Sequence, residues 1–233
     1  MNIAPQRKKK IVSSPLLKNF DRMSTQPLPK AVIFDLDGTL YDKKALARRL
    51  ILASLCHGDL GFLRREQQVR KKLRGTPYPS EEQFYEAFFA EFPHPAKARE
   101  WYFQRYMPLM ARILQKHHQL YAWVPEIVKQ LQDQRVKIVI FSDYGSVPEK
   151  LQAIGFDPQW ADALFDAPSL GGLKPCAESF AKLWEKMGVA PQECLMVGDR
   201  RDTDGLGAAA VKMPFLLYVR GSRPRIDLDA RHL

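Results

Sequence analysis

The sequence AVIFDLDGT at residues 31–39 decides how this chain folds. Its first four residues are apolar and partly β-branched, which is typical of a strand buried on both faces. Polar residues follow at once from Asp35 to Thr39, so the strand opens into a loop at its carboxyl end. In an open parallel sheet, ligands bind outside the carboxyl ends of the strands. The stretch therefore predicts a buried strand that presents two carboxylates, Asp35 and Asp37, to a binding site.

Strands and helices alternate over residues 125–219. The expected strands are the apolar runs at 136–141, 163–165, 194–197 and 215–219. Pro125 fits the first position of a short helix, and Gly155 and Gly188 are each expected to end a helix. This alternation predicts an α/β fold: a doubly wound, mostly parallel sheet with helices on both faces.

A helical pattern fills residues 43–118, directly after the first strand. Ser80 precedes Gln83 by three residues, a capping-box pattern that starts a helix. A later helix is expected to end or kink near Pro108. The aromatic residues of this segment recur at helical spacing. We interpret them as packing residues, with a ligand site as the alternative.

These patterns divide the chain into four parts. We expect a core from residues 30–42 and 119–220, with an α-helical cap at 43–118 inserted into it. Residues 1–29 are polar, basic and rich in proline, and they are expected to form a flexible extension. The remaining residues, 221–233, are expected to form a C-terminal tail.

The length of 233 residues and the content of 45% hydrophobic and 27% charged residues fit a soluble globular protein that needs no disulfide or structural metal. The three cysteines, Cys56, Cys176 and Cys194, form no CxxC pair, so we expect reduced thiols in a cytoplasmic protein. No apolar stretch approaches the roughly 18 residues of a membrane span. The basic run at 7–10 is interpreted as a solvated lead-in, with a targeting signal as the alternative.

Polar clusters lie at or near the carboxyl ends of the expected strands. They are Asp35–Thr39, Ser142-Asp143, Lys174-Pro175 and Gly198–Asp204. Taken singly, each is explained by an ordinary turn, a helix cap or a solvated loop. Together they bring carboxylates, a hydroxyl and a lysine to one sheet edge. Phosphoryl transfer needs this set, because a cation held by carboxylates offsets the repulsion between an anionic ester and an anionic nucleophile.

The four clusters, in this order over residues 31 to about 219, resemble the motifs of the haloacid dehalogenase superfamily in its phosphatase branch. The resemblance implies that Asp35 is the nucleophile and forms an aspartyl-phosphate. It implies that Asp37 is the general acid and base. Ser142 would bind the phosphoryl oxygens, and Lys174 would neutralise charge between the nucleophile and the phosphate.

The resemblance also implies Mg²⁺ as the cofactor. Its ligands would be Asp35, the backbone carbonyl of Asp37, Asp199 and Asp204. An acid at the position of Asp37 distinguishes the phosphatases of the superfamily from its dehalogenases. In one departure from the family pattern, Asp143 stands where an asparagine is usual, which adds negative charge beside the phosphate.

The predicted substrate is a small phosphorylated molecule, such as a nucleotide or sugar phosphate. The formal net charge of +10 is consistent with an anionic ligand. The expected cap is also basic, through Arg48, Arg49, Arg64, Arg65, Arg70, Lys71, Lys72 and Arg74. These residues either attract a polyanionic substrate or form a solvated face.

Two other functions stay open at this point. The first is a phosphotransferase, such as a phosphosugar mutase, that uses the same intermediate on Asp35. The second is a non-catalytic protein that binds nucleic acid through its basic cap and N-terminus. The presence of Asp35, Asp37 and Asp199 argues against the second function, so nucleic acid is not the expected partner. No membrane association is expected, and the oligomeric state does not follow from the sequence.

Overall fold

The computed structural model describes residues 28–224 and 226. Residues 29–224 form one compact unit, and all the helices and strands given below belong to it. Residues 1–27 of the predicted extension, with its basic run, and residues 225 and 227–233 of the predicted tail lie outside the described residues.

Five parallel strands form the sheet, in the order β3-β2-β1-β4-β5. They are β1 (Ala31–Phe34), β2 (Lys137–Ser142), β3 (Ala163–Asp166), β4 (Cys194–Gly198) and β5 (Phe215–Leu217). The central strand is β1, and its first residue, Ala31, lies opposite Lys137 of β2 and Cys194 of β4. The predicted parallel sheet is confirmed, with β2 starting one residue later and β5 ending two residues earlier than expected.

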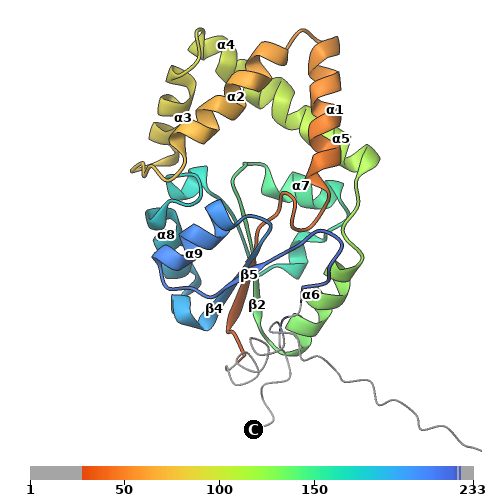
Figure 1. The fold of residues 1–233 in the computed structure, drawn as a ribbon, viewed down its shortest axis with the longest axis vertical. Coiled ribbons are helices and arrows are strands. Elements are labelled where there is room, and N and C mark those ends of the chain that lie inside the picture. The colour runs from red at the N-terminus through yellow and green to blue at the C-terminus, as the bar shows by residue number, and fades with distance from the viewer. Residues whose placement is uncertain (1–27, 225, 227–233) are drawn as a thin grey trace, which may run out of the picture. The chain divides into compact units, whose positions relative to one another are not determined.

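Helices cover both faces of the sheet (Figure 1). On one face lie α6 (Trp123–Asp133) and α7 (Val147–Ala153), and on the other α8 (Ala177–Met187) and α9 (Leu206–Ala210). The ring of Phe34 on β1 lies 6.3 Å from that of Trp123 on α6, and the ring of Phe141 on β2 lies 5.3 Å from that of Phe180 on α8. Because both faces are covered, every residue of β1 is buried.

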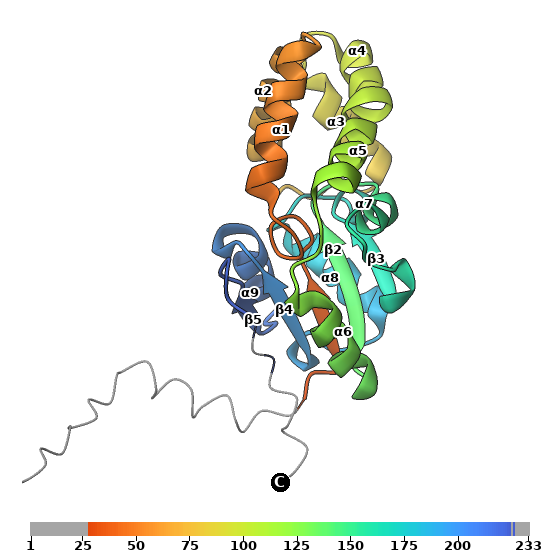
Figure 2. The same cartoon turned by 90° about the vertical axis from the view of Figure 1, so that its right-hand side faces the viewer.

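Further helices lie beyond the carboxyl end of the sheet and form the helical cap (Figures 1 and 2). They are α1 (Lys43–Cys56), α2 (Leu60–Leu73), α3 (Glu81–Ala90), α4 (Pro95–Glu100), the π-helical stretch Trp101–Tyr106 and α5 (Met107–His117). The predicted insertion of a helical cap after the first strand is confirmed. The hydroxyl of Ser80 accepts a hydrogen bond of 3.2 Å from the Gln83 N–H, so α3 begins as predicted.

Aromatic side chains form much of the interior of the helical cap. Phe84 and Phe88 on α3 are fully buried, with ring centroids 5.9 Å apart. Tyr102, on the π-helical stretch, is also fully buried and lies 5.6 Å from Phe88. These contacts agree with the interpretation of the cap aromatics as packing residues.

The prediction for Pro125 was wrong, and the helix end expected near Pro108 is absent. The π-helical stretch passes directly into α5, and Pro108 occupies the first turn of α5. Pro125 is not the first residue of its helix, since α6 begins at Trp123. Position 125 tolerates proline because the first N–H groups of an α-helix have no acceptor within it.

None of the described helices is long and apolar enough to cross a lipid bilayer. The three cysteines are free thiols, with Cys56 exposed and Cys176 and Cys194 buried.

Candidate active site

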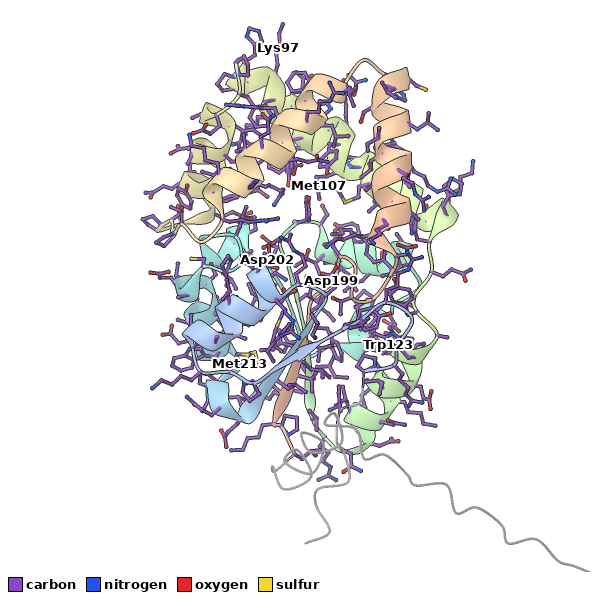
Figure 3. All side chains as sticks on the ribbon, viewed as in Figure 1. Lys97, Met107, Trp123, Asp199, Asp202 and Met213 are labelled. Atoms are coloured by element: carbon purple, nitrogen blue, oxygen red, sulfur yellow. The ribbon has the colours of Figure 1, made fainter. Side chains whose placement is uncertain are left out.

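A cavity lies at the carboxyl edge of the sheet, beneath the helical cap, and we call it the sheet-edge cavity. Its lining residues are Asp35, Asp37, Lys43, Arg70, Arg74, Asp143, Tyr144, Leu173, Lys174, Asp199, Arg200, Thr203 and Asp204. All four polar clusters expected from the sequence contribute to this list. Figure 3 shows Asp199 at the sheet edge that faces the cap.

Asp35 is held in one orientation at the end of the central strand. Its backbone N–H donates to the Val197 carbonyl at 2.9 Å, which extends the pairing of β1 with β4. One carboxylate oxygen accepts from Lys174 Nζ at 2.6 Å, and the other accepts from the Thr39 hydroxyl at 2.8 Å. The Asp35 side chain is thus buried and oriented by two donors from different loops.

Three carboxylates meet beside Asp35 in an arrangement that fits a divalent cation. One oxygen from each of Asp35, Asp199 and Asp204 lies within 4.8 Å of the others. Burial raises the pKa of Asp204 to about 7; Lys174, 2.7 Å away, opposes this shift and the charge of Asp35 adds to it. Carboxylate oxygens are the ligands that Mg²⁺ prefers, and these three residues supply them beside two lysines, Lys174 and Lys43.

Asp199 lies close to the backbone of the first loop. Its carboxylate is 3.1 Å from Lys43 Nζ at the start of α1. Burial raises the pKa of Asp199, the charge of Asp35 raises it further, and Lys43 opposes the shift. Gly38 has a φ of +104°, and a Cβ there would lie 2.4 Å from a carboxylate oxygen of Asp199. Position 38 therefore requires glycine for its backbone conformation and for the placement of Asp199.

The side chain of Asp37 is held by a different set of partners. Both of its oxygens accept from Lys150 Nζ at 2.6 Å. One oxygen also accepts from the Tyr41 hydroxyl at 2.5 Å, and the other from the Ser142 hydroxyl at 2.8 Å. Burial acts to raise the pKa of Asp37, but the charge and hydrogen bonds of Lys150 outweigh it and lower the pKa to about 2. Asp37 is therefore a fully paired carboxylate.

Two further predicted site residues differ in their placement. The amine of Lys174 donates to both Asp35 and Asp204. Burial acts to lower the pKa of Lys174, but these two carboxylates outweigh it and raise the pKa well above the usual value. Ser142 is fully buried beside Asp37 and accepts from the Tyr144 N–H at 3.0 Å. It is not among the described residues that line the cavity.

Asp143 has a local role that an asparagine would share. Its side-chain oxygen accepts from the Lys174 N–H at 2.9 Å, and this contact joins the second and third polar clusters. An asparagine carbonyl accepts such a bond equally well. The departure from the family pattern thus preserves the contact and adds a charge to the cavity wall.

The basic cap residues divide into two groups. Arg70 and Arg74 line the sheet-edge cavity, and the other six do not. Arg70 is buried, is paired with Glu66, and donates to the Asp143 carbonyl at 2.8 Å, which links α2 to the sheet loop. Asp202, to which the family motif assigns no role, pairs with Arg200 and lies 3.8 Å from Arg74.

Sequence reasoning missed Tyr41 and Lys150, and it assigned no role to Thr39, although Thr39 belongs to the first polar cluster. Thr39 and Tyr41 each lie four residues after the aspartate that they contact, so their proximity in sequence was a usable signal. Lys150 lies 113 residues from Asp37, in a helix with no motif. Nothing in the sequence marks Lys150, because only the packing of α7 against the sheet brings it to Asp37.

Known proteins resemble this chain over most of its length. The chain is 25% identical over 221 residues to the glyceraldehyde 3-phosphate phosphatase of Methanopyrus kandleri, covering 86% of this chain and 90% of the relative. Its fold resembles that of a HAD phosphatase from Thermococcus onnurineus, with a TM-score of 0.58, 24% identity and coverage of 84% and 89%. The magnesium-bound HAD-hydrolase YfnB from Bacillus subtilis gives a TM-score of 0.59, 17% identity and coverage of 82% and 89%.

The family model for haloacid dehalogenase-like hydrolases matches residues 29–212. This range contains the whole helical cap and four of the five strands. Since the match covers most of the chain and the fold agrees with it, the chain belongs to the haloacid dehalogenase-like hydrolases.

Proposed function

We propose that this protein is a Mg²⁺-dependent phosphatase that hydrolyses small-molecule phosphate monoesters through an aspartyl-phosphate on Asp35. The observation that carries the proposal is the placement of Asp35. It follows the central strand, two donors orient it, and one of its carboxylate oxygens lies within 4.8 Å of an oxygen of Asp199 and of Asp204. The phosphatases among the similar proteins support the same chemistry.

In the first step, a carboxylate oxygen of Asp35 attacks phosphorus, and the bond from phosphorus to the ester oxygen breaks. Lys174 donates a hydrogen bond to Asp35. Its positive charge therefore lies where negative charge develops on the phosphoryl oxygens in the transition state. Asp37 supplies the proton that the departing alcohol needs, and because its own pKa is about 2 it draws this proton from Lys150, which regains it after the second step. The products of this step are a free alcohol and an acyl-phosphate on Asp35.

In the second step, water attacks the phosphorus of the acyl-phosphate. Asp37 accepts a proton from that water, and the bond between phosphorus and Asp35 breaks. This releases inorganic phosphate and regenerates the Asp35 carboxylate. Mg²⁺ held by Asp35, Asp199, Asp204 and the Asp37 carbonyl would offset the charge of the phosphate and orient it.

The first test measures phosphate release from p-nitrophenyl phosphate and glyceraldehyde 3-phosphate, with Mg²⁺ or with EDTA. We expect EDTA to abolish turnover and Asp35→Asn to lower kcat by at least about a thousandfold, because the substitution removes the nucleophile. Asp202→Asn makes the same chemical change at an exposed carboxylate and should stay close to wild type.

Three outcomes would contradict this function. If no phosphate ester is turned over, or if Asp35→Asn stays fully active, the mechanism is wrong. If the ester is consumed while its phosphate appears on a second sugar and not in solution, the enzyme is a phosphotransferase with the same intermediate.

A further inference from the structure

A second cavity of about 150 Å³ adjoins the sheet-edge cavity and extends into the helical cap; we call it the cap cavity. Asp37, Lys43 and Tyr144 line both cavities. Asp37, the proposed proton donor to the departing alcohol, therefore lies where the two cavities meet. An ester whose phosphoryl group occupies the sheet-edge cavity would direct its alcohol portion past Asp37 into the cap cavity.

The wall of the cap cavity is mainly apolar. Leu46 and Leu50 on α1, Leu63 on α2 and Met110 on α5 line it, and all four are buried. Ala47, also on α1, lines the cavity but is exposed, so the cavity reaches solvent at that point. A wall of this composition favours an apolar group, since burying each CH₂ group stabilises the complex.

Few polar groups lie beyond the junction of the cavities. The hydroxyl of Tyr41 already donates a hydrogen bond to Asp37. Tyr106 and Gln67 complete the polar part of the described lining. Both side chains are uncharged, so each can form a hydrogen bond with a hydroxyl group of an uncharged alcohol.

Charge is confined to the junction. Asp37 and Lys43 are the charged residues among the described lining of the cap cavity, and Lys43 already lies 3.1 Å from Asp199. Arg70 and Arg74 line the sheet-edge cavity instead. A second phosphate or carboxylate in the cap cavity would lose its water and find only Lys43, which is already paired with Asp199, so its burial is costly.

We infer that the cap cavity is the leaving-group subsite, and that it selects phosphate monoesters of compact, uncharged, predominantly apolar alcohols. The inference rests on the proposed function and narrows its substrate class. It also bears on the basic cap: most of its basic residues are exposed, and none of the eight lines the cap cavity.

The test is a series of ethyl, propyl, butyl and hexyl phosphates, with phosphoglycolate as the charged counterpart of propyl phosphate. We expect kcat/KM to rise about fourfold per added CH₂ until the cavity is full. Phosphoglycolate should fall at least about tenfold below propyl phosphate, because its carboxylate would find only Lys43, which is already paired with Asp199. Equal or higher kcat/KM for phosphoglycolate, or no rise along the alkyl series, would overturn the inference.

Variants test whether the dependence of kcat/KM on alkyl length arises in the cap cavity. Ala47→Phe narrows the cavity from an exposed position, so it should lower kcat/KM for hexyl phosphate much more than for ethyl phosphate. Leu50→Asn should flatten the rise along the alkyl series. Leu52→Asn is the matched control on the same helix, since Leu52 is 64% exposed and does not line the cavity. Equal losses for all esters in Ala47→Phe would contradict the subsite.

The proposed function and the subsite fail in different ways. If the subsite alone is wrong, Mg²⁺-dependent phosphate release persists and still requires Asp35, but it shows no preference for apolar alcohols. If the proposed function is wrong, no ester in the series releases phosphate and Asp35→Asn changes nothing.

Discussion

Lys150 is the residue that most changes how the site is understood. Its ammonium lies 2.6 Å from both oxygens of Asp37, and its side chain is 1% exposed. Burial lowers the pKa of Lys150, and the charge of Asp37 opposes that shift. Tyr41 and Ser142 hold the same carboxylate, so three donors from three segments determine its position. We expect Lys150 to act as a positioning residue that orients Asp37 toward the ester oxygen.

This role predicts a loss that depends on the leaving group. Lys150→Met should lower kcat/KM for ethyl phosphate by about a hundredfold, because a well-positioned proton donor typically accelerates a reaction by at least that factor. For p-nitrophenyl phosphate the loss should be far smaller, because p-nitrophenolate departs without a proton. Steady-state kinetics with both esters measure the difference, and Lys150→Arg should restore part of it.

Asp37→Asn is the reference for this measurement, since it removes the proton donor itself. It should show the same selective loss with ethyl phosphate. Equal losses with both esters in Lys150→Met would mean that Lys150 only maintains the fold.

At the scale of single elements, α3 stabilises the helical cap. Phe88 on α3 is fully buried and contacts rings from its own helix and from the π-helical stretch. Phe103, on the π-helical stretch, is 41% exposed although it also contacts cap aromatics. Neither residue is among the described lining of the two cavities.

Phe88→Ala should therefore destabilise the protein without altering substrate recognition. Loss of a buried phenyl ring typically costs about 3–5 kcal/mol of unfolding free energy. Urea unfolding measures this cost, and KM for a small ester should stay unchanged in the variant that remains folded. Phe103→Ala, the matched control, should lose clearly less stability. A large rise in KM for Phe88→Ala would instead favour a ligand site at these aromatics.

At the scale of the whole molecule, His118 lies where the chain leaves the helical cap for the sheet domain. Its ring packs edge-to-face on Tyr41 at 5.8 Å, and its Nε2 is buried without a hydrogen-bond partner. Burial lowers the pKa of His118; Arg49 and His117 lower it further, and Asp42 opposes them. The folded state therefore favours the neutral imidazole.

This shift predicts a loss of stability in acid. Because the folded-state pKa lies below the ordinary value of 6.5, the unfolded state binds more protons as the pH falls. The contribution of His118 is full above about pH 6.5 and is lost as the pH falls through the folded-state pKa. His118→Phe should reduce the difference in unfolding free energy between about pH 7.5 and pH 5, measured with urea at each pH.

His94→Phe is the control for this comparison, because His94 is exposed on the helical cap. It should keep the pH dependence of the wild-type protein. An unchanged pH dependence in His118→Phe would contradict the assignment to His118.

Local patterns predicted much of the fold and the general location of the site. The apolar run before Asp35 predicted the central strand, and the polar clusters after the other strands predicted one sheet edge with several carboxylates. The structure brings Asp35, Asp199 and Asp204 together at that edge. This prediction succeeds because parallel strands necessarily present their carboxyl ends on one side of the sheet.

The sequence by itself therefore determined the parallel sheet, the inserted helices and the edge at which the carboxylates meet, since strand burial and strand direction follow from local composition. Only the tertiary structure decided that Asp37 pairs with Lys150, that Asp143 bonds the Lys174 backbone and that an apolar cavity continues into the cap. These features depend on segments far apart in the chain packing against each other. Side-chain contacts of that kind leave no periodic or spaced pattern in the sequence.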